Sequence, residues 1–235
     1  MLRYLLASQG DIQSYVVQLL LCLPIILLSL SLHETAHGYV AYKLGDPTAH
    51  SLGRLTLNPL RHLDPIGFLC MLLFGFGWAK PVPINTRYFK HPKRDMALTG
   101  VAGPLSNLLL AMVFTLLLKI ADATLMNIGY HSEITAQMAS YLMIFLFLGI
   151  QLNVGLAIFN LIPLPPLDGS RVFYALLPSK YYFKVMKYER YIQIALMVAL
   201  FFGVLTPLLN FLTDGTMKLL FRMFFLKGSY FWSYI

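Results

Sequence analysis

The sequence has little charge, few cysteines and no long polar stretch. Asp, Glu, Lys and Arg make up 12% of its 235 residues, against roughly 25% in soluble domains, and 58% of the residues are hydrophobic. The two cysteines, Cys22 and Cys70, lie inside apolar runs, where they are typical of small buried residues rather than of a disulfide framework. With no repeat and no polar segment large enough for a second domain, the composition predicts a single integral membrane domain over residues 1–235, with its core at 13–171.

Acidic residues are scarcer than basic ones. There are 10 Asp and Glu against 18 Lys and Arg, which gives a formal net charge of +8. In a soluble protein such an excess would favour nucleic acid as a partner. In a membrane protein it is explained by the concentration of Lys and Arg in cytoplasmic loops. We therefore expect a lipid bilayer, and no nucleic acid, around this chain, while the sequence leaves the oligomeric state open.

Long apolar segments are what the sequence does contain. A helix needs about 20 apolar residues to cross the hydrocarbon core. We predict four crossing segments, at residues 13–43, 96–120, 136–162 and 188–212. Between the first two, residues 46–95 form a membrane-associated loop with a short apolar stretch, typical of a re-entrant segment, and a proline-broken run at 80–90, which predicts an edge strand. The predicted fold is an all-α polytopic bundle of about four to five helices with a re-entrant or β-hairpin region.

The two ends of the chain carry their own expectations. The apolar run that starts near Tyr15 leads into the first span with no small-residue cleavage site, so we expect it to be retained as a helix rather than removed as a signal peptide. The tail, 216–235, is apolar with a few basic residues, and it either lies in the membrane interface or crosses once more.

The distribution of positive residues predicts the orientation of the chain. Residues 43–94 contain eight Lys or Arg and residues 164–190 contain five, whereas residues 121–135 contain none. The positive-inside rule places the first two regions in the cytoplasm and the third outside. The ends of the first and third spans are then expected at the same, cytoplasmic, side of the membrane.

One motif in the first span carries chemistry. Residues 33–37 read HETAH, an instance of the H-E-x-x-H pattern of helical zinc hydrolases. Residues four apart fall on one face of a helix, so His33 and His37 can direct both imidazoles at one ion. Glu34 stands beside them, where it can take the proton of an activated water. The motif therefore predicts one Zn2+ per chain, bound by His33 and His37, with Glu34 as the general base.

The third zinc ligand has to come from a small set of carboxylates, because a catalytic zinc takes three protein ligands and keeps one open position. On the predicted topology the others lie on the outer side (Asp11, Asp122, Glu133, Asp214), in the cytoplasmic loop (Asp46, Asp64, Asp95) or at the start of the fourth span (Glu189). Asp168 is the carboxylate that a helix end brings to the depth of HETAH, and prolines precede it. We predict Asp168 as the ligand; the alternative is an ordinary turn residue in PLDG.

Polar side chains recur inside the later spans. We expect Gln151, Asn153 and Asn160 to face the bundle interior. Asn107 and Asn160 are candidates for positioning the substrate or its oxyanion. Interhelical hydrogen bonding is the favoured explanation for Asn107, Gln151 and Asn153, and an equal alternative for Asn160. The remaining histidines are interpreted as loop or interface residues: His50, His62, His91 and His131.

Three motifs together resemble one family. HETAH in a membrane span, GPLSN at 103–107 and FNLIPLPPLDG at 159–169 are similar to the site-2 protease family of intramembrane zinc metalloproteases (peptidase family M50). The resemblance covers about residues 32–171, and the stretch 45–67 resembles the compact bacterial branch, which has no PDZ or CBS domain.

The resemblance implies an activity and a place in the cell. It implies zinc bound by His33, His37 and Asp168, catalysis by Glu34 and cleavage of transmembrane protein substrates. It also implies a role for Asn160 in holding the substrate. The location implied is the bacterial cell membrane, with several crossings and the active site toward the cytoplasmic side.

Other functions fit parts of the sequence. A membrane-anchored zincin of the soluble type needs a sizeable polar catalytic domain, which the sequence lacks. A transporter or channel would use the same intramembrane polar residues, hold no tightly bound zinc and keep its activity after Glu34→Gln. A membrane scaffold with a degenerate site would leave Glu34 and Asp168 unpaired in the bilayer, at a high energetic cost.

Overall fold

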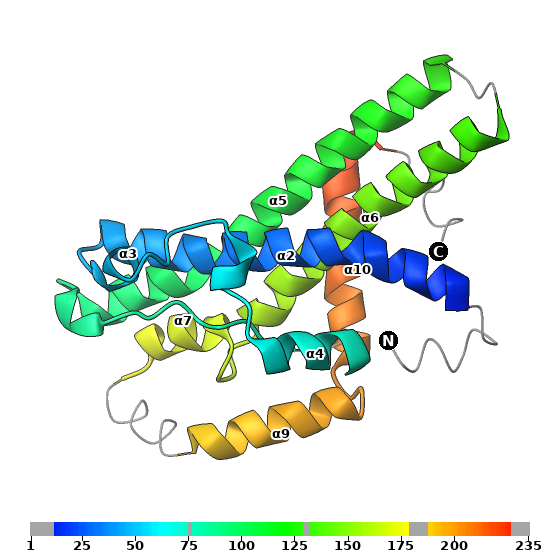
Figure 1. Ribbon diagram of the computed structural model, residues 1–235. Coiled ribbons are helices and arrows are strands. Elements are labelled where there is room, and N and C mark those ends of the chain that lie inside the picture. The colour runs from blue at the N-terminus through cyan, green and yellow to red at the C-terminus, as the bar shows by residue number, and fades with distance from the viewer. Residues whose placement is uncertain (1–11, 75–76, 129–131, 179–187, 227–235) are drawn as a thin grey trace. The chain divides into compact units, whose positions relative to one another are not determined.

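The computed structural model describes residues 12–74, 77–128, 132–178 and 188–226 (Figure 1). The expected start of the chain, before residue 12, and the end of the predicted tail, 227–235, lie outside them. The chain divides into two compact units, Met1–Gly103 and Pro104–Ile235. The single integral domain stays a prediction.

The first unit is built on one long helix. Helix α2 (Ile12–Lys43) contains the apolar run that ends in HETAH, and its part from Val16 is long and apolar enough to cross a membrane. The helix stops at Lys43, after which Gly45 adopts a φ of 107° and the Asp46 N–H donates to the carbonyl of Ala41 at 2.9 Å. A left-handed glycine after the last turn is the usual end of a helix, so the residues of the predicted first span do form one helix.

The connection that follows α2 folds back along the HETAH end of that helix. It contains the short helices α3 (Thr48–Ser51), η1 (Pro59–Arg61), α4 (Pro65–Phe74) and η2 (Thr86–Tyr88), and both α3 and η1 contact α2. The Thr35 hydroxyl of the motif donates to the carbonyl of Thr56 at 2.7 Å. This connection therefore forms a wall beside the metal motif.

The predicted edge strand at 80–90 does not form. In the described part of the connection the only β pairing is an isolated antiparallel bridge between Leu63 and Ala79. Pro81 and Pro83 have no N–H for a ladder, and the N–H of Val82 donates to the Glu34 side chain instead. The β-hairpin part of the predicted fold is thus not supported, whereas the short apolar stretch before it is the helix α4.

Helix α5 (Pro92–Ile128) begins in the first unit and contains the predicted second span. Its first turn is held by Asp95, whose carboxylate accepts the His91 N–H at 3.0 Å and the Arg94 Nε–H at 2.9 Å. An acidic side chain at the positive end of the helix dipole stabilises this start. One turn later, the Thr99 hydroxyl donates to the Asp95 carbonyl at 2.7 Å.

The second unit packs the later part of α5 and helix α10 (Thr206–Met223) against α6 (Glu133–Leu161). The ring of Phe114 on α5 lies 6.1 Å from that of Phe145 on α6, and a Cβ at Gly149 would collide with Phe114. The residues of the predicted third span form the helix α6, which is long and apolar enough to cross a membrane, although Gln151, expected inside, is exposed.

The predicted fourth span is bent. It consists of α9 (Glu189–Phe201) and α10, which meet at 79° across a short break. Gly203 in the break has a φ of 71°, which suits a turn, and Pro207 lies in the first turn of α10, where proline is tolerated. Among the described residues, three helices are long and apolar enough to cross a membrane, or four if the bent pair is one span. Residues 216–223 of the predicted tail belong to α10.

Candidate metal centre

The two histidines of HETAH form a close pair on α2. Their Nε2 atoms lie 3.0 Å apart and their rings meet edge to face at 4.6 Å. Both side chains are buried, His33 with 6% and His37 with 4% of its surface exposed. The helical spacing alone accounts for this approach, because residues four apart lie one above the other on a helix.

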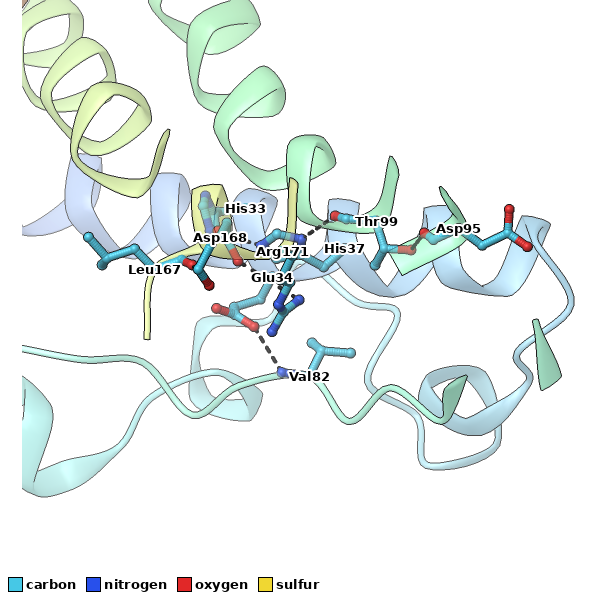
Figure 2. A network of polar contacts seen from close by, with 10 residues as sticks. His33, Glu34, His37, Val82, Asp95, Thr99, Leu167, Asp168 and Arg171 are labelled. Carbon is cyan, nitrogen blue, oxygen red and sulfur yellow. Dashed lines mark hydrogen bonds and ion pairs between the residues drawn. The ribbon is translucent and has the colours of Figure 1, made fainter. Parts of the chain in front are cut away.

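A hydrogen bond at Nδ1 of His37 determines the tautomer of its imidazole. Nδ1 lies 2.6 Å from the carbonyl oxygen of Thr99, as the dashed line in Figure 2 shows. A carbonyl oxygen only accepts hydrogen bonds, so Nδ1 carries the proton, and in the neutral ring Nε2 keeps its lone pair. Histidines that bind a metal through one ring nitrogen usually donate the N–H of the other nitrogen to a carbonyl or carboxylate. His37 has this arrangement.

Gly103 makes room for the pair. A Cβ built at this position on α5 would collide with His37 Nε2 and lie 2.6 Å from His33 Nε2. Only a residue without a side chain lets the backbone of α5 pass this close to both imidazoles. Thr99 and Gly103, one helical turn apart on α5, thus place a carbonyl at His37 and a gap beside both rings.

The pair fits zinc. Two imidazole nitrogens bound to a tetrahedral zinc at about 2.0–2.1 Å lie roughly 3.3 Å apart, close to the 3.0 Å found here. Neutral imidazole is also a ligand that zinc prefers. His33 and His37 could therefore supply two ligands of one zinc ion, and a catalytic zinc takes a third from the protein.

Glu34 points to the wall formed by the connection. Its Oε2 accepts the N–H of Val82 at 2.8 Å, and the side chain is half-buried (Figure 2). This hydrogen bond orients the carboxylate. The arrangement suits a base that holds a water beside the histidine pair.

Asp168 is described within the second unit. It is the first residue of α7 (Asp168–Leu176), is 7% exposed, and its Oδ1 lies 3.8 Å from Nη1 of Arg171, one turn further on. A Cβ at Gly169 would collide with the carbonyls of Leu161 and Ile162, so the end of α6 and the start of α7 are closely packed. The carboxylate is thereby fixed at a buried helix start, as a ligand would need to be.

The two asparagine candidates differ in their contacts. Asn107 is fully buried and its Nδ2 donates to Oδ1 of Asn153 at 3.0 Å, while Asn153 donates to the Gly149 carbonyl. This is the interhelical hydrogen bond expected for these residues. Asn160 is half-buried and donates to the Leu156 carbonyl of its own helix at 2.9 Å. Substrate positioning by either asparagine stays a prediction.

Of the remaining histidines, three are described. His62 is 2% exposed and its Nε2 lies 2.7 Å from the Thr56 carbonyl, His50 stacks on Tyr42, and the backbone N–H of His91 donates to the Asp95 carboxylate. His131 lies outside the described residues. The groups that the sequence analysis missed are backbone groups, the Thr99 carbonyl and the Val82 N–H. Every residue carries such groups, so no residue type could have indicated them.

Comparison with known proteins gives a consistent result. The family model described as peptidase family M50 matches residues 21–206. YwhC of Bacillus subtilis, whose name assigns it to the zinc metalloproteases, is 44% identical over 203 residues, which cover 85% of this chain and 90% of that protein.

More distant relatives are longer. Rip2 of Mycolicibacterium smegmatis, also named for a zinc metalloprotease, is 33% identical over 66% of this chain and 57% of its own length. Zinc metalloprotease MJ0392 of Methanocaldococcus jannaschii is 29% identical over 77% of this chain and 42% of its own length. No solved structure matches the chain.

Proposed function

Since this chain belongs to peptidase family M50 and is therefore a membrane zinc metalloprotease, we propose that it hydrolyses peptide bonds in or near the transmembrane segments of other membrane proteins. The observation that carries the proposal is the buried histidine pair, with Nε2 atoms 3.0 Å apart, inside a helix apolar enough to cross a membrane. A metal site in such a helix serves substrates that are themselves in the bilayer.

We assign one zinc to His33, His37 and Asp168. Asp168 supports this role as a buried carboxylate at a helix start, and it adds the negative charge that two neutral imidazoles lack. When bound, zinc supplies a Lewis acid that polarises the scissile carbonyl and favours ionisation of the attacking water.

The general base in this proposal is Glu34. It takes the proton of the attacking water and passes it to the leaving amine, so that the amide bond breaks as the new acid forms. The Val82 N–H holds the carboxylate in place during both transfers. Asn160 is the side chain assigned to the substrate backbone, and the Lys and Arg of residues 43–94 support a cytoplasmic position of the site.

The decisive experiment combines zinc analysis with cleavage of a model transmembrane substrate. We expect about one zinc per chain in the purified protein, cleavage by the wild type and none by Glu34→Gln. Glu133→Gln is the matched control, because Glu133 is an exposed residue in the first turn of α6. Equal cleavage by Glu34→Gln and the wild type would overturn the role of Glu34, and zinc-free protein without cleavage would favour a transporter or channel.

A further inference from the structure

We propose that Arg54 is a positioning residue for Glu34 and acts on it through the peptide group between Pro81 and Val82. The inference rests on the proposed role of Glu34 as general base. Arg54 lies in the connection after α3, 20 residues beyond Glu34, and all the contacts involved are inside the first unit.

The contacts form a continuous series. Nη2 of Arg54 donates to the carbonyl of Lys80 at 2.8 Å and to that of Pro81 at 3.3 Å. The Pro81 carbonyl and the Val82 N–H belong to one peptide group, and that N–H donates to Glu34 Oε2 at 2.8 Å. A cation at the oxygen end of a peptide polarises it and strengthens its N–H as a donor. The guanidinium of Arg54 and the carboxylate of Glu34 thus bind opposite ends of the same peptide group.

The segment around Val82 needs such support. No ladder holds it, since the described connection has only the isolated bridge at Ala79. Before Val82, the chain is held by Arg54 and by a hydrogen bond from the Lys80 N–H to the His62 carbonyl, at 2.8 Å. On the other side, the Asn85 N–H donates to Oδ2 of the buried Asp46 at 2.7 Å. Val82, 5% exposed, is therefore fixed from both directions.

The charge of Arg54 needs its own explanation. The side chain is 9% exposed, and no carboxylate among the described residues forms an ion pair with it. Burying a cation without a carboxylate partner is costly. A neutral amide could donate to the same carbonyls with less loss of hydration. A positive charge is favoured here because it acts on the Glu34 carboxylate through the peptide.

The test compares Arg54→Gln, which removes the charge, with Arg54→Lys, which keeps it. Arg61→Gln is the matched control, because Arg61 is an exposed arginine of the same connection. The full-length protein in detergent is assayed for zinc content and for kcat and KM on a model transmembrane substrate. Loss of a charge-assisted hydrogen bond predicts a kcat roughly 10- to 100-fold lower for Arg54→Gln. We expect unchanged KM and zinc content, partial recovery in Arg54→Lys and no effect of Arg61→Gln.

The outcomes separate this inference from the proposed function. If Glu34→Gln retains cleavage, the proposed function fails. If Glu34→Gln is inactive while Arg54→Gln cleaves like Arg61→Gln, the inference about Arg54 alone is overturned. It is also overturned if Arg54→Lys, like Arg54→Gln, loses zinc or stability in proportion to its activity, because Arg54 would then only support the fold.

Discussion

Replacing Gly103 with alanine would place a methyl group between α5 and the histidine pair. Ordinary contact begins at 3.4 Å, so a Cβ at 2.6 Å from His33 Nε2 overlaps it by 0.8 Å (3.4 − 2.6), and the overlap with His37 Nε2 is larger. Overpacking of this kind costs about 1–3 kcal/mol, partly offset by about 1 kcal/mol from the higher helix propensity of alanine. We expect a net loss of at most about 2 kcal/mol in the free energy of unfolding.

The effect on metal binding should be larger than the effect on stability. To relieve the overlap, the imidazoles have to turn or α5 has to retreat, which also lengthens the bond from His37 to the Thr99 carbonyl. Changes in the groups that orient a metal ligand typically lower affinity about 10- to 100-fold. Competition with a chromogenic chelator measures this affinity, and thermal unfolding in detergent measures stability.

Gly155→Ala is the control for the Gly103 experiment. Gly155 lies inside α6, and among the described residues a Cβ there meets nothing within 4 Å. We expect this variant to bind zinc like the wild type and to be slightly more stable. If Gly103→Ala binds zinc with wild-type affinity and cleaves at the wild-type rate, the close approach of α5 to the pair plays no part in metal binding.

Three further variants test other parts of the structure. Asp168→Asn should lower the zinc content of purified protein severalfold or more, measured by elemental analysis, and unchanged zinc would remove Asp168 from the ligand set. Asn107→Ala should cost about 1 kcal/mol of stability, and less in an Asn153→Ala background; additive losses would contradict the hydrogen bond between them. Gly149→Ala should lower the unfolding temperature, because its Cβ would strike the ring of Phe114; overpacking of about 1–3 kcal/mol predicts several degrees.

Local geometry explains which parts of the site could be predicted. The spacing of His33 and His37 is enough to bring their rings together, because a helix is a regular object and needs no distant partner. The apolar runs likewise predict the three long helices. A glycine such as Gly103 in a span indicates that another group approaches the helix closely. The sequence could not show that this group is the histidine pair.

The errors concern places where distant segments compete for the same groups. Residues 80–90 have the extended character of a strand, but the Val82 N–H is taken by Glu34 and the Asn85 N–H by Asp46, both far away in sequence. The sequence did not predict the bend between α9 and α10, because the apolar run continues across it. Gly203 in the bend and Pro207 in the first turn of α10 were the available signals. Gln151 was expected inside on polarity alone, and its helix face turned out to be the exposed one.

The contact between the Thr99 carbonyl and His37 also ties the metal site to the axial position of α5. A helix advances about 1.5 Å per residue, so sliding α5 by one residue would withdraw this carbonyl from Nδ1. The same slide would move the gap at Gly103 along the helix axis, away from the two imidazoles. Both contacts of the imidazole pair with α5 therefore depend on the position of this helix along its axis. A change in bilayer thickness that shifts α5 along its axis would therefore change the geometry of the two imidazoles.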